Sequence, residues 1–166
     1  MRIAISGTHG SGKSTLIDAF LLAHPTFVYE PEPYEVLQEE YGDTFAADPS
    51  AEDFYRQLAF NINRLRQYQP TNDVIYERCP VDFLAYLFAL HDLRRATAAV
   101  QLVKSAIGLV KSALPLLDVI VFLPLNTADR IEVSNWEDPV LRTAVDRRLI
   151  CLLGDDDLDL FAPRFP

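Results

Sequence analysis

Residues 7 to 15 read Gly7-Thr8-His9-Gly10-Ser11-Gly12-Lys13-Ser14-Thr15 and form a complete G-x-x-x-x-G-K-[ST] motif. The motif follows an apolar run at residues 1–5 and precedes a helical pattern at residues 16–22. A strand, a glycine-rich turn and a helix in this order are the context that the motif requires. In such a loop, successive backbone N–H groups point inward and the helix N-terminus adds the positive end of its dipole. The stretch therefore predicts a phosphate-binding loop.

This loop predicts that the chain binds a nucleoside triphosphate, with ATP and Mg²⁺ as its cofactors. Lys13 would reach the β- and γ-phosphates, and the Ser14 hydroxyl would hold Mg²⁺. The loop alone does not distinguish a kinase from a GTPase, a motor or a regulatory switch. Residues 126–129 read N-T-A-D and lack the lysine of the guanine-reading N-K-x-D motif, which disfavours a GTPase.

Composition predicts one domain over residues 1–166, because 49% of the 166 residues are hydrophobic and neither a repeat nor a linker divides the chain. The formal net charge of −9 disfavours nucleic acid as a partner. No apolar stretch has the length of a membrane span, and the N-terminus lacks the pattern of a secretory signal. We therefore expect a cytoplasmic protein without a membrane partner. Cys79 and Cys151 are expected to be reduced thiols.

The apolar pattern predicts strands that alternate with helices. Strands are expected at 2–6, 27–29, 73–76 and 118–123, and helices at 13–23, 34–41, 51–69, 81–92, 94–113 and 138–153. Near-continuous apolar strands, of which 118–123 is the clearest, are typical of strands covered on both faces. This predicts an α/β fold of three layers, with a parallel sheet of four or five strands wrapped by helices. Residues 154–161 are a poor fifth strand, and their acidic run is expected to be a solvated tail.

Charged residues follow the ends of three predicted strands. Lys13 follows the first strand, Glu30 and Glu32 follow the second, and Glu77 and Arg78 follow the third. Ligands of parallel sheets bind beyond the carboxyl ends of the strands, so these side chains are expected to meet on one rim. Glu77 would hold the Mg²⁺ shell, and Arg78 would neutralise charge on a transferred group. A salt-bridged strand end is the alternative interpretation.

The helix at 51–69 carries a polar stripe. Gln57, Asn61 and Arg64 are spaced i, i+4 and i+7 and so share one face. An amide and a guanidinium on this face could read the hydrogen-bonding edge of a base, and a solvated polar face is an equally good interpretation. Ser50 is the expected N-cap, with Asp53 at the third helical position.

Several short motifs resemble those of the deoxynucleoside kinase and thymidylate kinase group of phosphate-loop enzymes, over about residues 1–150. The motifs and the segments that resemble them are E-P-V at 32–35, D-P…F-Q at 48–57, E-R-S at 77–79 and the A-Y stretch at 85–86. Their order and spacing agree with the family, and the phosphate loop is the most specific of them. Three features depart from it: Cys79 replaces the serine of E-R-S, the clustered arginines of the lid are not reproduced, and a clear fifth strand is absent.

The resemblance implies roles for individual residues. Glu32, or less favourably Glu30, would be the general base for the acceptor hydroxyl. Gln57 and Arg64 would face the base of the acceptor, with Asn61 beside them. Asp82 resembles, one position out of register, an acid that orients the base-reading arginine. In a lid over about residues 126–146, Arg142 or Arg147 would reach over the phosphates; ordinary exposed arginines of a helix are an equally good interpretation.

These features predict an ATP-dependent phosphotransferase whose acceptor is a nucleoside, a nucleoside monophosphate or a similar small ribosylated molecule. The alternative from another class is a regulatory ATP-binding or ATPase switch without a small-molecule acceptor. A homodimer through the helix at 94–113 would suit the resembled family. The apolar flank of that helix is more often core packing; it consists of Ala99, Val100, Val103, Ile107 and Val110.

Overall fold

The computed structural model describes residues 1–45, 49–95, 99–126 and 138–161. Its centre is one sheet of four parallel strands in the order β2-β3-β1-β4. The strands are β1 (Arg2–Ser6), β2 (Val28–Glu30), β3 (Val74–Glu77) and β4 (Val119–Phe122). Each strand begins and ends within one residue of its predicted range. The parallel α/β sheet expected from the sequence is thereby confirmed.

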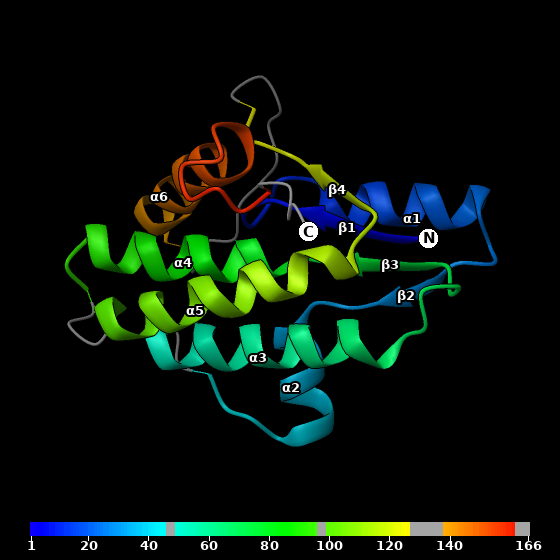
Figure 1. Ribbon diagram of the computed structural model, residues 1–166, viewed down its shortest axis with the longest axis horizontal. Helices are drawn as coiled ribbons and strands as arrows, with labels where there is room; N and C mark the ends of the chain where they lie inside the picture. Colours follow the sequence, from blue (N-terminus) through cyan, green and yellow to red (C-terminus); the bar gives the residue numbers. More distant parts are fainter. Residues whose placement is uncertain (46–48, 96–98, 127–137, 162–166) are drawn as a thin grey trace, which may run out of the picture.

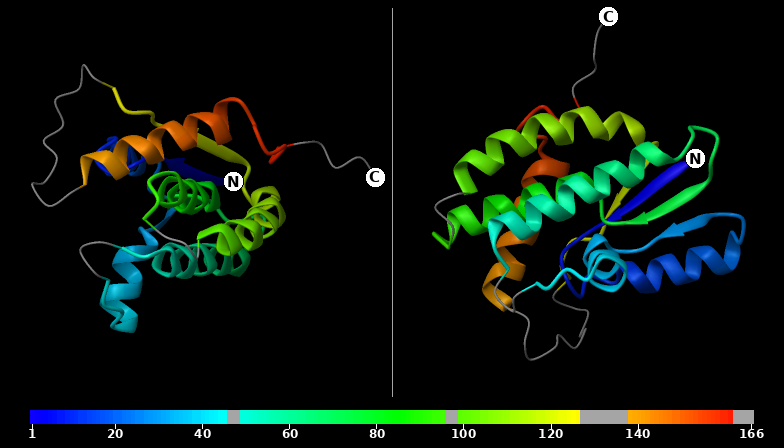
Figure 2. Two further views of the ribbon diagram at one scale, coloured as in Figure 1. Left: turned by 90° about the vertical axis from the view of Figure 1, so that its left-hand side faces the viewer. Right: turned by 90° about the horizontal axis from the view of Figure 1, so that it is seen from below.

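Helices cover the sheet on both sides. They are α1 (Lys13–Ala23), α2 (Pro33–Tyr41), α3 (Ala51–Gln67), α4 (Pro80–Asp92), α5 (Ala99–Ala113) and α6 (Pro139–Leu149). Figure 1 shows α1 on one side of the strands and α3, α4 and α5 on the other. The views in Figure 2 show α3, α4 and α5 packed together and α6 lying against α4. The described residues thus form the three predicted layers.

The core has two unequal parts because β1 and β3 are buried on both faces. The larger part joins the sheet to α3, α4, α5 and α6 and includes Ala4 of β1. The smaller part lies under α1 and consists of Ile3, Ile5, Ile17 and Ile75. Alternation along β1 sends Ile3 and Ile5 to α1 and Ala4 to the larger core. The central strands are therefore the rigid base from which the phosphate loop emerges.

The expectation that residues 118–123 are covered on both faces is wrong. Val119 of β4 is 41% exposed, and the other three residues of this strand are only partly buried. The reason is its position, because β4 is an edge of the sheet and pairs only with β1 among the described strands. A continuous apolar run does not distinguish an edge strand from a central one.

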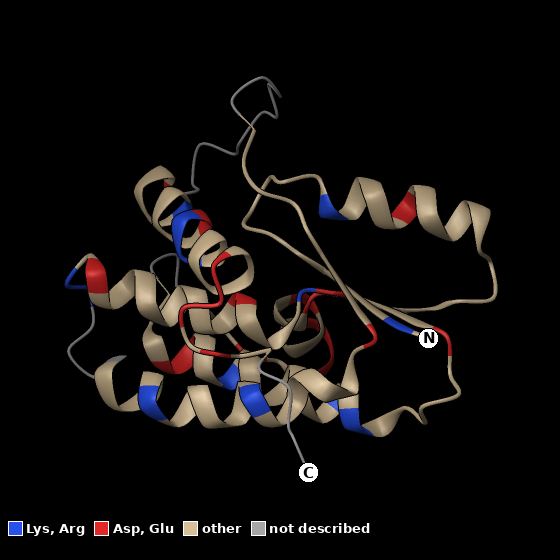
Figure 3. Ribbon diagram, turned by 45° about the horizontal axis from the view of Figure 1, so that its top comes forward, with Lys and Arg blue, Asp and Glu red and all other residues tan. Residues whose placement is uncertain are grey.

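The end of the described chain also differs from the prediction. The predicted helix at 138–153 divides into α6 and a π-helical turn, η2 (Ile150–Gly154), and a 3₁₀ turn, η1 (Leu114–Leu116), precedes β4. Figure 3 shows the acidic segment that follows η2. A carboxylate oxygen of Asp156 accepts a hydrogen bond from the Leu160 N–H at 2.5 Å, and Leu160 is buried in the larger core. Leu160 thus anchors the segment, whereas Asp155, Asp157 and Asp159 are exposed as expected of a solvated acidic run, and residues 154–161 form no fifth strand.

Two helix predictions have clear outcomes. Ser50 caps α3, and a capping box with Asp53 is present as predicted. Val103 and Val110 of α5 are buried and Val100 is 41% exposed, so the flank of this helix is mostly core packing. Among the described helices, none combines the length and the apolar character that crossing a membrane requires.

Candidate active site

The phosphate loop joins β1 to α1, and its backbone requires glycine. Gly7 has φ 155°, and a Cβ there would lie 2.8 Å from the carbonyl oxygen of Leu123. Gly12, at the N-cap of α1, has φ 90°, a conformation that residues with a side chain rarely adopt. Gly10 has φ 61°. The glycines therefore allow the loop to fold closely over the end of β1.

Lys13 is almost fully buried at the start of α1. Its Nζ donates a hydrogen bond to the carbonyl oxygen of Thr8 at 3.1 Å. Burial and the nearby Arg78 lower the pKa of Lys13 to about 8, although Glu32 and other carboxylates act in the opposite direction. Burial and Arg78 also lower the pKa of His9 to about 4, so its ring is neutral at pH 7. The loop therefore holds a lysine whose charge is only partly compensated by the surrounding carboxylates.

Glu77, at the end of β3, is held by two hydroxyl groups. Ser14 Oγ donates to one carboxylate oxygen at 2.9 Å, and the Tyr29 hydroxyl donates to the other at 2.7 Å. Sequence reasoning missed Tyr29. The feature that could have indicated Tyr29 is the register of β2 and β3, which pairs Tyr29 with Ile75, two residues before Glu77. This register is known only once the two strands are aligned in the structure. Ser14 and Glu77, the two residues predicted to hold the metal, thus lie side by side.

Arg78 connects the acidic residues to the phosphate loop. Its Nε donates to the Glu32 carboxylate, and its NH1 group donates to the Gly7 carbonyl at 3.1 Å. The guanidinium is 1% exposed and lies 5.4 Å from the ring centre of Tyr86. Burial alone would raise the pKa of Glu32, but Arg78 and Lys13 lower it below its ordinary value. Glu32 is therefore an ionised carboxylate at the edge of the loop.

The backbone of Arg78 is itself unusual. Its φ is 75°, in the left-handed region that a residue with a long side chain rarely occupies. Its N–H donates to the Ile5 carbonyl at 2.9 Å, so the turn follows directly from the β1–β3 pairing. Strained conformations of this kind persist where the surrounding structure fixes them and are frequent at functional sites. The turn directs the side chain back over the end of β1.

Asp82 lies at the start of α4 and contacts the loop. One carboxylate oxygen accepts a hydrogen bond from the Gly7 N–H at 3.0 Å, and the other accepts from the Cys79 N–H at 2.8 Å. The first oxygen is also 3.7 Å from the Arg78 guanidinium. The resemblance implied that Asp82 would orient Arg64. The Arg64 guanidinium instead donates two hydrogen bonds to the Glu30 carboxylate, at 2.6 and 2.8 Å. The structure thus joins Asp82 to the phosphate loop.

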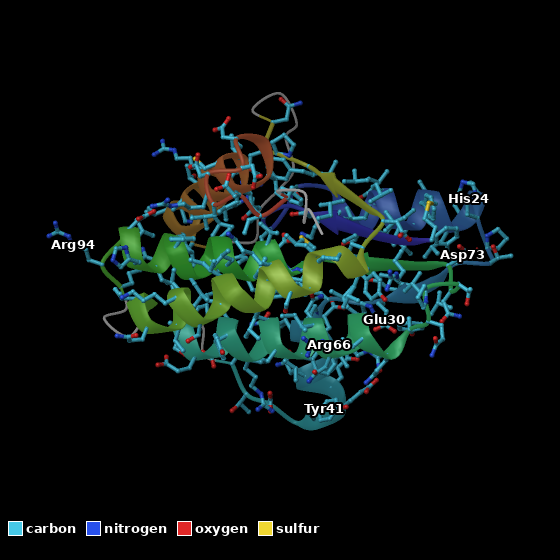
Figure 4. All side chains as sticks on the ribbon, in the orientation of Figure 1. His24, Glu30, Tyr41, Arg66, Asp73 and Arg94 are labelled. Carbon is cyan, nitrogen blue, oxygen red and sulfur yellow. The ribbon has the colours of Figure 1, made fainter. Side chains whose placement is uncertain are left out.

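Glu30 and Arg64 form a partly buried ion pair between β2 and α3, where Figure 4 labels Glu30. The Tyr68 hydroxyl also donates to the Glu30 carboxylate. Both charged groups are therefore neutralised by each other, and an acceptor would have to share or displace this pair to bind either of them. Tyr68 was not singled out by the sequence, because it lies beyond the polar stripe of α3.

The polar stripe of α3 is not a solvated face. Gln57 and Asn61 are 4% and 3% exposed, which contradicts that alternative. Asn61 Nδ2 donates to the Arg78 carbonyl at 3.5 Å, whereas Asn61 Oδ1 is buried and has no hydrogen-bond partner within the described residues. An unsatisfied buried amide oxygen is uncommon in native structures.

An aromatic pair lies close to this stripe. The rings of Phe54 on α3 and Tyr86 on α4 stack, with centroids 4.4 Å apart and planes 16° from parallel. The sequence analysis did not predict this pair. Since Tyr86 also contacts Arg78, the seam between α3 and α4 leads from the aromatic rings to the end of β3.

The two predicted lid arginines have different positions. The guanidinium of Arg142 donates to the loop carbonyls of His9 at 2.7 Å and Gly10 at 3.1 Å. Arg147 is exposed on α6. Residues 127–137 of the predicted lid, and Asp48 of the D-P segment, lie outside the described residues. Of the two candidates, Arg142 is the one that the structure brings to the loop.

Comparison with known proteins finds matches among solved structures but none among family models or curated sequences. A deoxyadenosine kinase from M. mycoides, with products dCMP and a flexible dCDP bound, has a TM-score of 0.64 at 18% identity and covers 96% of this chain and 86% of that chain. The same kinase with bound dATP has a TM-score of 0.63 at 16% identity, and the match covers the same shares of the two chains.

A further solved structure, NadR protein in complex with NR, gives a TM-score of 0.66 at 15% identity. The match covers 95% of this chain but 43% of that chain. At these identities the likeness concerns the fold. The phosphate-loop α/β fold that the motifs predicted is confirmed, and the chain has the fold of the deoxynucleoside-kinase-like phosphate-loop proteins.

Proposed function

We propose that the chain is an ATP-dependent phosphotransferase that uses Mg²⁺ and transfers the γ-phosphoryl group to a hydroxyl of a nucleoside or similar small ribosylated molecule, or to the phosphate of a nucleoside monophosphate. One observation carries the proposal: Arg78 binds the Glu32 carboxylate and the Gly7 carbonyl of the phosphate loop at the same time. An ionised carboxylate therefore lies at the edge of the loop that would hold the donor phosphates.

The donor would bind at the phosphate loop. The N–H groups of the loop and the dipole of α1 would hold the phosphates, and Lys13 would contribute the positive charge nearest to them. Its lowered pKa supports this role, because an anion would supply the compensating charge that the free site lacks. The loop residues concerned are Gly7, Thr8, His9, Gly10, Ser11, Gly12, Lys13, Ser14 and Thr15.

Ser14 and Glu77 would hold the magnesium ion. Their oxygen atoms lie 2.9 Å apart and are of the hard type that Mg²⁺ prefers. No group of three or more His, Cys, Asp or Glu in the described chain could hold a metal by itself. Nucleotide-bound Mg²⁺ needs only one or two protein ligands, because phosphate oxygens and water supply the others. When bound, the ion would neutralise charge on the phosphates.

The acceptor would lie between Glu32 and the seam of α3 and α4. Gln57 and the unsatisfied Asn61 Oδ1 would meet the polar edge of a base, and the buried Phe54–Tyr86 stack would lie beside them. Arg64 with Glu30 would border this space. The carboxylate of Glu32 would orient the hydroxyl and accept its proton as the oxygen attacks the γ-phosphorus.

Arg78 would stabilise the charge that develops during transfer. As the bond from the γ-phosphorus to the bridging oxygen breaks, negative charge grows on that oxygen and persists on the phosphoryl oxygens, and a buried guanidinium interacts strongly with it. Asp82 would keep both Gly7 and Arg78 in place. In phosphoryl transfer most of the catalysis is positioning and charge stabilisation, which suits a site built on strand ends.

The test is an acceptor panel. The protein is incubated with ATP, Mg²⁺ and separate nucleosides or nucleoside monophosphates, and products are identified by mass spectrometry. The proposal predicts one phosphorylated product class that is absent with the Lys13→Ala variant. ATP hydrolysis that is independent of every acceptor, or binding without turnover, would instead support a regulatory ATP-binding switch.

A further inference from the structure

Arg142 contacts the phosphate loop from α6 through both its side chain and its backbone. The guanidinium donates to the carbonyl oxygens of His9 and Gly10, and the Arg142 carbonyl accepts a hydrogen bond from the Thr8 hydroxyl at 3.4 Å. Thr8 itself is fully buried. Three consecutive loop residues are therefore hydrogen-bonded to one residue of α6 that lies at least 132 positions later in the sequence.

The position of Arg142 is fixed by the packing of α6. One face of this helix is buried through Leu141, Val145 and Leu149. At its end, Arg148 makes two hydrogen bonds to the Asp92 carboxylate of α4, at 2.5 and 2.6 Å. Arg142 therefore reaches the loop from a helix anchored on α4.

The orientation of the loop carbonyls determines the orientation of the neighbouring N–H groups. A trans peptide unit is planar, and its C=O and N–H bonds point in opposite directions. The described chain contains no cis peptide bond. Because the carbonyls of His9 and Gly10 point to Arg142, the N–H groups of Gly10 and Ser11 point away from it. These are amides of the loop that surrounds the phosphates.

We propose that Arg142 is a positioning residue that holds two peptide units of the phosphate loop in the orientation that binds the β-phosphate. The inference rests on the proposed function, because it assumes that the loop receives a nucleotide. It gives Arg142 a different role from a lid arginine that contacts the transferred phosphoryl group. The planar guanidinium of Arg142 can donate to two neighbouring carbonyls at once, a geometry that a lysine ammonium cannot reproduce.

Equilibrium titration with ADP and with ATP, in the presence of Mg²⁺ and without acceptor, tests this role. Arg142→Ala is predicted to weaken both nucleotides by the same factor, about tenfold for two charge-assisted hydrogen bonds. Arg142→Lys keeps the charge but loses the fork, and is predicted to weaken both as well. Arg66→Ala removes an equal charge from the surface of α3, where Figure 4 labels Arg66, and controls for net charge.

Amide hydrogen exchange of the nucleotide-free protein gives a second readout. The N–H groups of Gly10 and Ser11 are predicted to exchange faster in Arg142→Ala, while the amides of β1 keep their wild-type rates. If Arg142→Ala does not fold, as judged by its melting curve, Arg142→Lys supplies the comparison in both assays.

Two results would overturn the inference. In the first, Arg142→Ala loses at least tenfold more affinity for ATP than for ADP, while Arg142→Lys retains its affinity for both. This would assign Arg142 to direct contact with the γ-phosphate. Unchanged affinity in both variants would remove Arg142 from nucleotide binding. Neither result touches the proposed function, which fails separately if the wild-type protein binds nucleotide but phosphorylates no acceptor.

Discussion

Lys13 carries a positive charge that burial and the nearby Arg78 disfavour. Its pKa is about 8 in the folded chain, below the ordinary 10.5, so the unfolded chain binds more protons between these values. The contribution of Lys13 to stability is therefore smallest below pH 8, and the free energy of unfolding increases as the pH rises from 8 toward 10.5. The site keeps a charge that its own environment disfavours.

Replacement of Lys13 by Met is predicted to stabilise the nucleotide-free protein. The melting temperature at pH 7 should rise by about 3 °C, and the difference from wild type should shrink above pH 8 as the native lysine loses its proton. Nucleotide binding should be lost. Calorimetry from pH 6 to 10 measures this, with Lys104→Met at an exposed position as the control. A lower melting temperature than wild type at pH 7 would show that Lys13 stabilises the empty loop.

Glu32 is predicted to act in turnover rather than in nucleotide binding. The Glu32→Gln variant keeps an oxygen that can accept the hydrogen bond from Arg78 but cannot take up a proton. Its kcat should fall by about 100-fold or more, while the Kd for ATP changes by less than about threefold. Glu35→Gln, exposed on α2, should retain wild-type turnover. Comparable activity in Glu32→Gln would exclude this carboxylate as the base.

At the scale of elements, α3 is important because it carries the buried polar stripe. Its first turn is closed by Ser50, whose hydroxyl accepts from the Asp53 N–H at 3.1 Å. Ser50→Ala is predicted to cost about 1 kcal/mol of the free energy of unfolding, because the helix loses its N-cap. Denaturant unfolding measures this. Ser112→Ala, at an exposed site near the end of α5, should change stability by less than about 0.5 kcal/mol.

Local features of the elements were predictable from the sequence, whereas contacts between distant elements were not. The phosphate loop and the strand ends were predictable, since motif spacing and apolar runs are local properties. The bond from Tyr29 to Glu77 depends on the register of two strands that α2 and α3 separate in sequence. The contact of Arg142 with the loop depends on how α6 packs against α4. Such relations arise from tertiary packing, to which no local pattern is sensitive.

Two differences between the structure and the sequence predictions have the same origin. The apolar run of β4 resembled a central strand, and only the sheet order places it at the edge. The acidic segment after η2 resembled a solvated tail, yet Leu160 within it is buried. In both cases the composition of the segment was interpreted correctly, but the neighbours that decide burial are supplied by distant parts of the chain.

At the scale of the whole molecule, we propose that residues 1–166 are one cooperative domain. The larger core joins residues of α3, α4, α5, α6 and the sheet, so loss of one element exposes apolar surface on the others. We predict a single unfolding transition, with midpoints that coincide for far-ultraviolet circular dichroism and calorimetry. Two separated transitions would show that the α1 side of the sheet, with its small core, unfolds independently.

The central claim is that donor and acceptor meet at one edge of the sheet. It is tested most directly by measuring ADP and phosphorylated acceptor in the same reaction, with the acceptor that the panel identifies. The account predicts one phosphorylated acceptor for each ADP, and ADP formation that falls to background when the acceptor is omitted. ADP that forms at the same rate without acceptor, and is matched by free phosphate, would contradict it.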